Sequence, residues 1–168
     1  MRVSFVVSTP VPRGARTRFR QSLKRIASEL GLERKGVAVL LTDDDTIASY
    51  NARWRRKNRP TDVLSFDGDG AAHLGDLIVS VDRARVQAAE AGHDLEDEIE
   101  ILLLHGVLHL LGHDHETDDG QMRRLEARLA RILLGRRALI ERQGSRPGGV
   151  GPRRTSGPGR GDGKRKGR

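Results

Sequence analysis

The sequence predicts an α+β fold, a single domain in which a small mixed β-sheet of about four strands packs with about five helices. Short apolar or alternating stretches typical of strands are interleaved with longer stretches whose apolar residues recur at helical spacing. Several strands are separated by enough residues for a crossover helix, which a parallel pair requires. The 168 residues suffice for one core, and a 36% hydrophobic content with 3% aromatic residues predicts that this core is aliphatic.

The first half of the chain is expected to form three strands and two helices. A glycine at position 31 ends the first helix, and Thr42 is the expected cap of the second, whose first turn is acidic (residues 43–45). Pro60 cannot continue a helix and directs the chain into an extended stretch. The predicted elements are strand 3–8, helix 16–30, strand 37–41, a helix through Arg55, and strand 63–66.

The second half is expected to add one strand and three helices. Asp82 is predicted to open a helix that Gly92 ends, and the run from Ile99 to Leu111 is too continuously apolar for anything but a buried helix. A charged amphipathic helix follows. The predicted elements are strand 76–81 and helices 82–91, 94–111 and 119–142.

Three histidines at the end of the buried helix predict a metal site. His105 and His109 are four residues apart and therefore share a helix face, so both imidazoles can reach one ion. Gly112 can take the positive φ that ends the helix and returns His115 toward the same point. Three ligands leave a fourth position open, as in a catalytic zinc site rather than a closed structural one. The chain has no cysteine, so its ligands are nitrogen and oxygen.

The same histidine spacing occurs in metzincin proteases, whose motif places a glutamate directly after the first histidine as general base. Here that position is Gly106, which cannot accept a proton. The metal prediction therefore stands, and a metalloprotease-like hydrolase is the less favoured interpretation.

The motif H-G-V-L-H-L-L-G-H-D-H, from His105 to His115, resembles the H-G-x-L-H-L-x-G-[YH]-D-H motif of the YbeY family of bacterial endoribonucleases, also called rRNA maturation factors. Residues 55–66 resemble that family's R-x-K-x-x-P-T-[DN]-V-L-S-F segment, and residues 74–80 resemble its L-G-D-I-x-I-S strand. The three motifs occur in the family's order.

The resemblance implies a single-strand-specific, metal-dependent endoribonuclease domain over residues 1–143. It implies one zinc ion bound by His105, His109 and His115, with RNA as substrate. It further implies a role in maturation of the 3′ end of small-subunit ribosomal RNA and in late-stage ribosome quality control, with the ribosome or small-subunit assembly proteins as partners. A ribosome-assembly factor that binds RNA around a structural zinc site is the alternative.

Arg55 is the guanidinium that the resemblance selects for catalysis, and Arg55 with Lys57 for substrate binding. Cleaving a phosphodiester requires stabilisation of charge on phosphoryl oxygens, which a metal and a guanidinium both supply. The surrounding cations flank Trp54, which suits a phosphate backbone passing beside an aromatic surface. A solvated helix end rich in cations explains the composition equally well.

The proton-transfer group is left open by the sequence. Asp114 and Glu116 flank His115, and either carboxylate could orient a ligand histidine or assist proton transfer. His113 stands where the family pattern often has tyrosine and is expected to be an ordinary loop histidine.

Residues 144–168 are expected to form a disordered basic tail rich in glycine, arginine, proline and lysine. They hold eight Lys and Arg against one Asp, out of a net charge of +8 for the chain, so residues 1–143 are nearly neutral. The tail either adds RNA affinity without sequence choice or only solubilises the chain. No apolar run reaches the roughly 18 residues of a membrane span. With no signal peptide pattern, no glycine-rich nucleotide loop and no cysteine, we expect a cytoplasmic protein without membrane contact or nucleotide cofactor.

Overall fold

The computed structural model describes residues 1–113 and 119–135. Its sheet has four strands in the order β1-β2-β4-β3, which are β1 (Arg2–Val7), β2 (Gly36–Thr42), β4 (His73–Ser80) and β3 (Val63–Asp67). β1 and β4 each pair parallel to β2, whereas β3 pairs antiparallel to β4. The predicted mixed sheet of about four strands is confirmed, and β3 forms one of its two edges.

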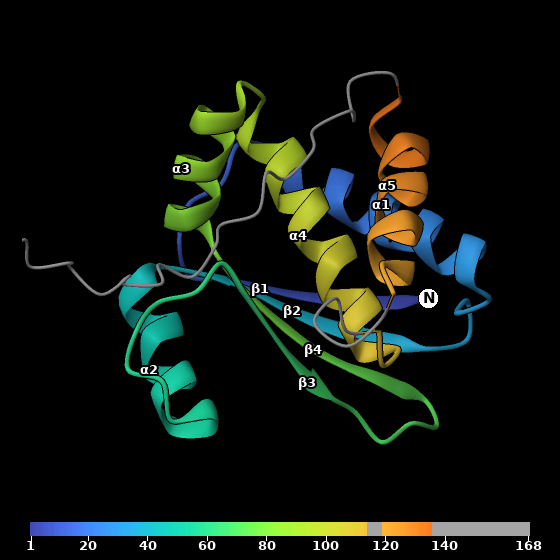
Figure 1. Cartoon of the computed structure of the whole chain (residues 1–168), viewed down its shortest axis with the longest axis horizontal. Coiled ribbons are helices and arrows are strands. Elements are labelled where there is room, and N and C mark those ends of the chain that lie inside the picture. The colour runs from blue at the N-terminus through green and yellow to red at the C-terminus, as the bar shows by residue number, and fades with distance from the viewer. Residues whose placement is uncertain (114–118, 136–168) are drawn as a thin grey trace, which may run out of the picture.

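Five helices cover the two faces of this sheet unequally. They are α1 (Ala15–Leu30), α2 (Asp44–Arg55), α3 (Val81–Ala91), α4 (Leu95–Leu110) and α5 (Gln121–Leu134). Figure 1 shows α1, α3, α4 and α5 on one side of the sheet and α2 alone on the other. α4 contacts β3, β4 and three other helices, so it is the central helix of the larger layer.

The two faces bury separate apolar clusters. The larger lies between the sheet and the four-helix layer and includes nearly every apolar residue of α4. The smaller lies under α2 and consists of Ile47, Leu64 and Ile78, with Tyr50 and Phe66 packed against them. Side chains alternate along β3, so Val63 faces the larger cluster while Leu64 and Phe66 face the smaller. β3 therefore separates the α4 side of the molecule from the α2 side.

Several predicted boundaries differ from the structure by one to three residues. Thr42 does not cap α2, because it is the buried last residue of β2 and its hydroxyl accepts a hydrogen bond from Ser8. Asp43 is the cap instead, since its carboxylate accepts from the Thr46 N–H at 2.7 Å. Ser80 caps α3 in the same way, so that helix begins one residue before Asp82. β4 begins at His73 rather than residue 76.

The described part of the last predicted helix is α5, and residues 136–142 of that prediction lie outside the described ranges, as does the predicted tail 144–168. Within the described residues, none of the helices combines the length and the apolar character needed to cross a bilayer.

A buried polar cluster ties α1 to α4. The Arg18 guanidinium forms ion pairs with Asp97 and with Glu100, the latter at 2.8 Å, and the Ser22 hydroxyl donates to Glu100 at 2.5 Å. Glu100 is only 2% exposed. The hydrogen bond to Glu100 and the attraction of both carboxylates raise the pKa of Arg18 above its ordinary value, against the opposing effect of burial. Arg18 thus gives one shared cationic partner to two carboxylates of the apolar helix, and the Ser22 hydroxyl adds a further donor to Glu100.

Replacing Arg18 by methionine is expected to lower the free energy of unfolding by about 2–3 kcal/mol, because it leaves two buried carboxylates without their cation. The partial exposure of the Arg18 side chain keeps this figure below that of a fully buried pair. Urea denaturation measures the loss. Arg128→Met is the matched control, because Arg128 is exposed and its Nη2 lies 3.9 Å from Oε2 of Glu29. This variant should change the free energy of unfolding by less than about 0.5 kcal/mol. Equal losses in the two variants would contradict the role given to the Arg18 cluster.

Candidate active site

The two histidines of α4 meet as their spacing predicts. Nε2 of His109 lies 3.0 Å from Nε2 of His105, and the two rings are steeply inclined to each other, with 4.6 Å between centroids. Both side chains are partly buried near the end of an otherwise buried helix. The two Nε2 atoms therefore converge on one point beside α4.

Gly112 ends this helix as expected. Its φ of +82° is left-handed, and its N–H donates to the His109 carbonyl at 2.9 Å. The His113 N–H donates to the Leu108 carbonyl at 3.1 Å, which completes a Schellman motif. The helix therefore ends directly after the histidine pair. His115, the third predicted ligand, and the carboxylates Asp114 and Glu116 lie outside the described residues.

A carboxylate from α5 orients the first histidine. Oε1 of Glu126 lies 3.0 Å from Nδ1 of His105, and both side chains are largely buried. Because a carboxylate accepts, Nδ1 of His105 is the donor in this contact, and in a neutral imidazole this leaves the lone pair on Nε2. This is the tautomer that a metal ligand needs, held by the kind of outer partner that metal-binding histidines commonly have.

The histidine pair fits a zinc ion in its donor chemistry. Two Zn–N bonds of about 2.0–2.1 Å in a tetrahedral arrangement would separate the nitrogens by roughly 3.4 Å, so the rings need to part by only a few tenths of an ångström. Within residues 1–113 and 119–135, no group of three potential metal-binding side chains is assembled. The predicted third ligand, His115, lies outside these ranges.

Arg55 lies at the edge of β3. It is the last residue of α2, and its Nη2 donates to the Ser65 carbonyl of β3 at 3.3 Å. The guanidinium thus reaches from the α2 side of the sheet to its free edge. On the other side of the sheet, β3 packs against α4, where the Val63 side chain lies close to Gly106. The edge strand therefore connects the arginine to the helix that carries the histidine pair.

Arg55 and Lys57 line one cavity of about 310 Å³. Arg59 and Arg83 contribute two more cations to its wall, beside Thr61 and Asn51. The cavity lies between the end of α2, the loop that follows it and the start of α3. Four cations around a polar hollow suit a phosphate-bearing ligand.

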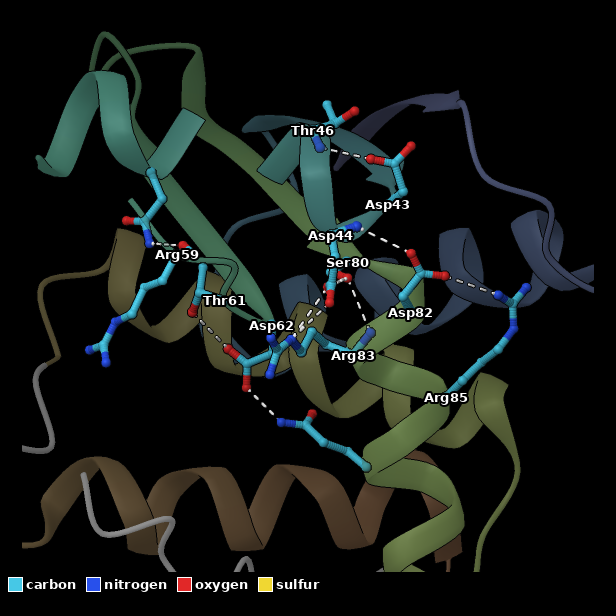
Figure 2. Close-up of polar contacts among 12 residues, drawn as sticks. Asp43, Asp44, Thr46, Arg59, Thr61, Asp62, Ser80, Asp82, Arg83 and Arg85 are labelled. Atoms are coloured by element: carbon cyan, nitrogen blue, oxygen red, sulfur yellow. Dashed lines mark hydrogen bonds and ion pairs between the residues drawn. The ribbon is translucent and has the colours of Figure 1, made fainter. Parts of the chain in front are cut away.

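The loop of this cavity, residues 56–62, is held by hydrogen bonds at its middle and at its end (Figure 2). The Asn51 amide donates to the Arg59 carbonyl at 2.7 Å, and the Gln87 amide of α3 donates to Asp62 at 3.1 Å. Arg83 forms an ion pair with Asp44, in which Nε of Arg83 lies 3.1 Å from Oδ2 of Asp44. At its start, the loop turns through Arg56, whose φ of +56° makes it the one left-handed residue other than glycine in the described ranges. These bonds fix the direction in which the loop presents Lys57 and Arg59.

Glu126 and Arg83 belong to the site but are not predicted from the sequence. Glu126 has a detectable signal, because it falls among Met122, Leu125 and Leu129 on the apolar face of an amphipathic helix, where a carboxylate needs a partner. Arg83 has no comparable signal, since an arginine in the first turn of a helix is commonplace. Its place in the cavity depends on the packing of α3 beside the loop.

The chain is similar to known proteins over most of its length. A protein-family model described as endoribonuclease YbeY matches residues 8–134. The chain is 48% identical to "Endoribonuclease YbeY" of Solibacter usitatus, over 73% of this chain and 85% of that protein, and 44% identical to that of Nautilia profundicola, over 66% and 81%. A Thermotoga maritima protein solved in solution has the same fold, with a TM-score of 0.60 at 24% identity, over 86% of this chain and 99% of that one. On the family match and these identities, the chain belongs to the endoribonuclease YbeY family.

Proposed function

We propose that this chain is a zinc-dependent endoribonuclease that cleaves single-stranded RNA. Its cellular role would be maturation of the 3′ end of small-subunit ribosomal RNA and late-stage ribosome quality control. Family membership supports the hydrolysis of RNA. The observation that carries the zinc dependence is the convergence of two Nε2 atoms 3.0 Å apart, one of them oriented by Glu126.

His105 and His109 would hold the zinc ion together with His115. When bound, zinc supplies Lewis-acid stabilisation of the phosphoryl group and acidifies water in the open position. Glu126 keeps His105 in the required tautomer and offsets part of the positive charge that the site gathers.

Arg55 binds the phosphate at the scissile bond in this proposal. Its guanidinium offers several N–H donors in a fixed plane, and its one described hydrogen bond, 3.3 Å to the Ser65 carbonyl, is long and exposed. Phosphate oxygens can therefore engage the guanidinium at little cost. As negative charge grows on those oxygens during cleavage, the arginine stabilises the transition state more than the ground state.

Lys57 binds a neighbouring phosphate of the strand, with Arg59 and Arg83 around the same cavity. A single strand can bend so that successive phosphates meet the β3 edge and the cavity, whereas a stacked duplex is far stiffer. The cations explain affinity for the backbone and carry no base specificity.

Single-turnover cleavage of a defined single-stranded RNA by chain with measured zinc content tests this function. Arg55→Ala should lower the cleavage rate constant by about 10²- to 10³-fold, the usual effect of removing one charge-stabilising donor, while zinc content stays unchanged. Arg16→Ala, an exposed arginine of α1 outside the cavity, is the matched control and should cleave normally.

Two results would contradict the proposed enzyme. Undiminished cleavage in the Arg55 variant would point to a contaminating nuclease. RNA binding without cleavage by fully zinc-loaded chain would favour an assembly factor in which the zinc is structural.

A further inference from the structure

Trp54 is a large aromatic side chain that the fold leaves open to solvent. It is the one tryptophan of the chain, and it is 60% exposed, whereas the tyrosine and the three phenylalanines are buried or half-buried. It lies in the last turn of α2, directly before Arg55. Exposing an indole in a domain with so few aromatic residues forgoes burial that the core could have used.

The ring of Trp54 is held in place by two neighbours. The Phe66 ring of β3 meets it edge-on at 6.2 Å between centroids, and the Arg53 guanidinium lies 5.3 Å from its centroid. Phe66 itself packs against the small cluster beneath α2. The indole is therefore held in position through Phe66, which packs on the apolar cluster, and most of its surface stays accessible to solvent.

The positive charge around Trp54 favours the binding of a polyanion. Residues 53–59 are all exposed, and they include five cations, namely Arg53, Arg55, Arg56, Lys57 and Arg59. Arg55 reaches the β3 edge through Ser65, the strand neighbour of Phe66. An aromatic ring within a cationic stretch is the pairing that single-stranded nucleic acids use, with bases stacking on rings and phosphates meeting cations.

We propose that Trp54 is the stacking platform for one unpaired base of the RNA, adjacent to the phosphate that Arg55 binds. The inference rests on the proposed ribonuclease function and deepens it by assigning a base-binding residue. Because every base has a π-face, the platform binds without choosing a sequence. It requires a base that is not paired within a duplex, so it contributes to single-strand preference.

The single tryptophan makes the proposal directly measurable. Stopped-flow mixing of the zinc-loaded full chain with a single-stranded oligoribonucleotide should change tryptophan fluorescence before product forms, and this signal can come only from Trp54. An abasic site walked along the oligonucleotide should abolish the change at one position, at a constant offset from the cleaved bond. This measurement uses the unaltered protein, so it does not depend on how any variant folds.

Substitution provides a second measurement. Trp54→Ala should raise KM for cleavage by about 5- to 100-fold, the usual effect of alanine substitution at a stacking aromatic, with kcat unchanged. Trp54→Phe should restore most of the affinity, because a smaller ring can still stack. Val86→Ala, which alters another exposed apolar residue, on α3, should leave KM unchanged.

Two failures are distinguishable. If the wild-type chain does not cleave the RNA, the proposed function itself fails. If it cleaves normally but no abasic position matters and Trp54→Ala keeps the wild-type KM, Trp54 only shields Phe66 and the stacking proposal is overturned.

Discussion

His109→Ala is expected to remove zinc from the chain and to lower RNA cleavage by about 10³-fold or more, because losing the metal removes several kcal/mol of transition-state stabilisation. The expectation follows from the 3.0 Å between Nε2 of His109 and Nε2 of His105. Elemental analysis of purified protein measures zinc per chain, and single-turnover kinetics measures cleavage. The fold should persist, since the histidine side chain is only partly buried.

His113→Ala is the matched control for this prediction. His113 follows Gly112 and takes part in the helix cap through its backbone N–H, which alanine retains. This variant should therefore keep both zinc and activity. Zinc retained in the His109 variant, or lost equally in both, would contradict the ligand assignment.

A Glu126 variant is expected to lose part of its zinc affinity in the same measurement. Glu126→Leu removes the partner of His105 Nδ1 without touching a proposed ligand. Zinc affinity should fall by about 10- to 100-fold, well short of the loss in the His109 variant. Unchanged affinity would mean that the carboxylate only supports the packing of α5 on α4.

Much of the fold can be predicted from the sequence because the signals that end its helices are local. Gly31, Gly92 and Gly112 each end a helix with positive φ, and helical or alternating periodicity locates the elements between them. The strand order cannot be predicted, since nothing in the periodicity of β3 says that it forms an edge and pairs only with β4. The prediction of Thr42 as the cap of α2 is wrong, because a threonine before an acidic turn has the composition of a cap even when it belongs to β2.

Part of the candidate site can likewise be predicted from the sequence, and part cannot. His105 and His109 are four residues apart, so helical geometry alone predicts that they meet. Glu126 joins them from 21 residues away, and its approach depends on how α5 packs against α4. Arg83 enters the basic cavity for a similar tertiary reason. Groups that neighbouring elements contribute cannot be found from the pattern of any single element.

Gly106 has a packing role that the histidine motif does not reveal. The position lacks a proton-accepting group, and it also has no room for a side chain. A Cβ at this position would lie 2.7 Å from Cδ2 of Leu77 and 3.4 Å from Cγ2 of Val63. Leu77 is 1% exposed and belongs to the larger core cluster, so its movement disturbs neighbours. Position 106 therefore faces the sheet, and α4 lies close to β3 and β4 because no side chain intervenes.

Gly106→Glu, which recreates the protease pattern, is consequently expected to destabilise the chain by about 4 kcal/mol or more and to produce no peptidase. The glutamate would have to displace Leu77 and bury a charge without a partner, and each effect alone costs several kcal/mol or forces the helix off the sheet. Gly106→Ala is the matched control, with an expected loss of about 1–2 kcal/mol, since a methyl group requires a smaller shift and alanine favours the helix. Urea denaturation, zinc content and hydrolysis of an unstructured peptide measure the three consequences. A Gly106→Glu chain that keeps wild-type stability and zinc and cleaves the peptide would show that position 106 faces the metal rather than the sheet, and would restore the protease interpretation that the glycine argues against.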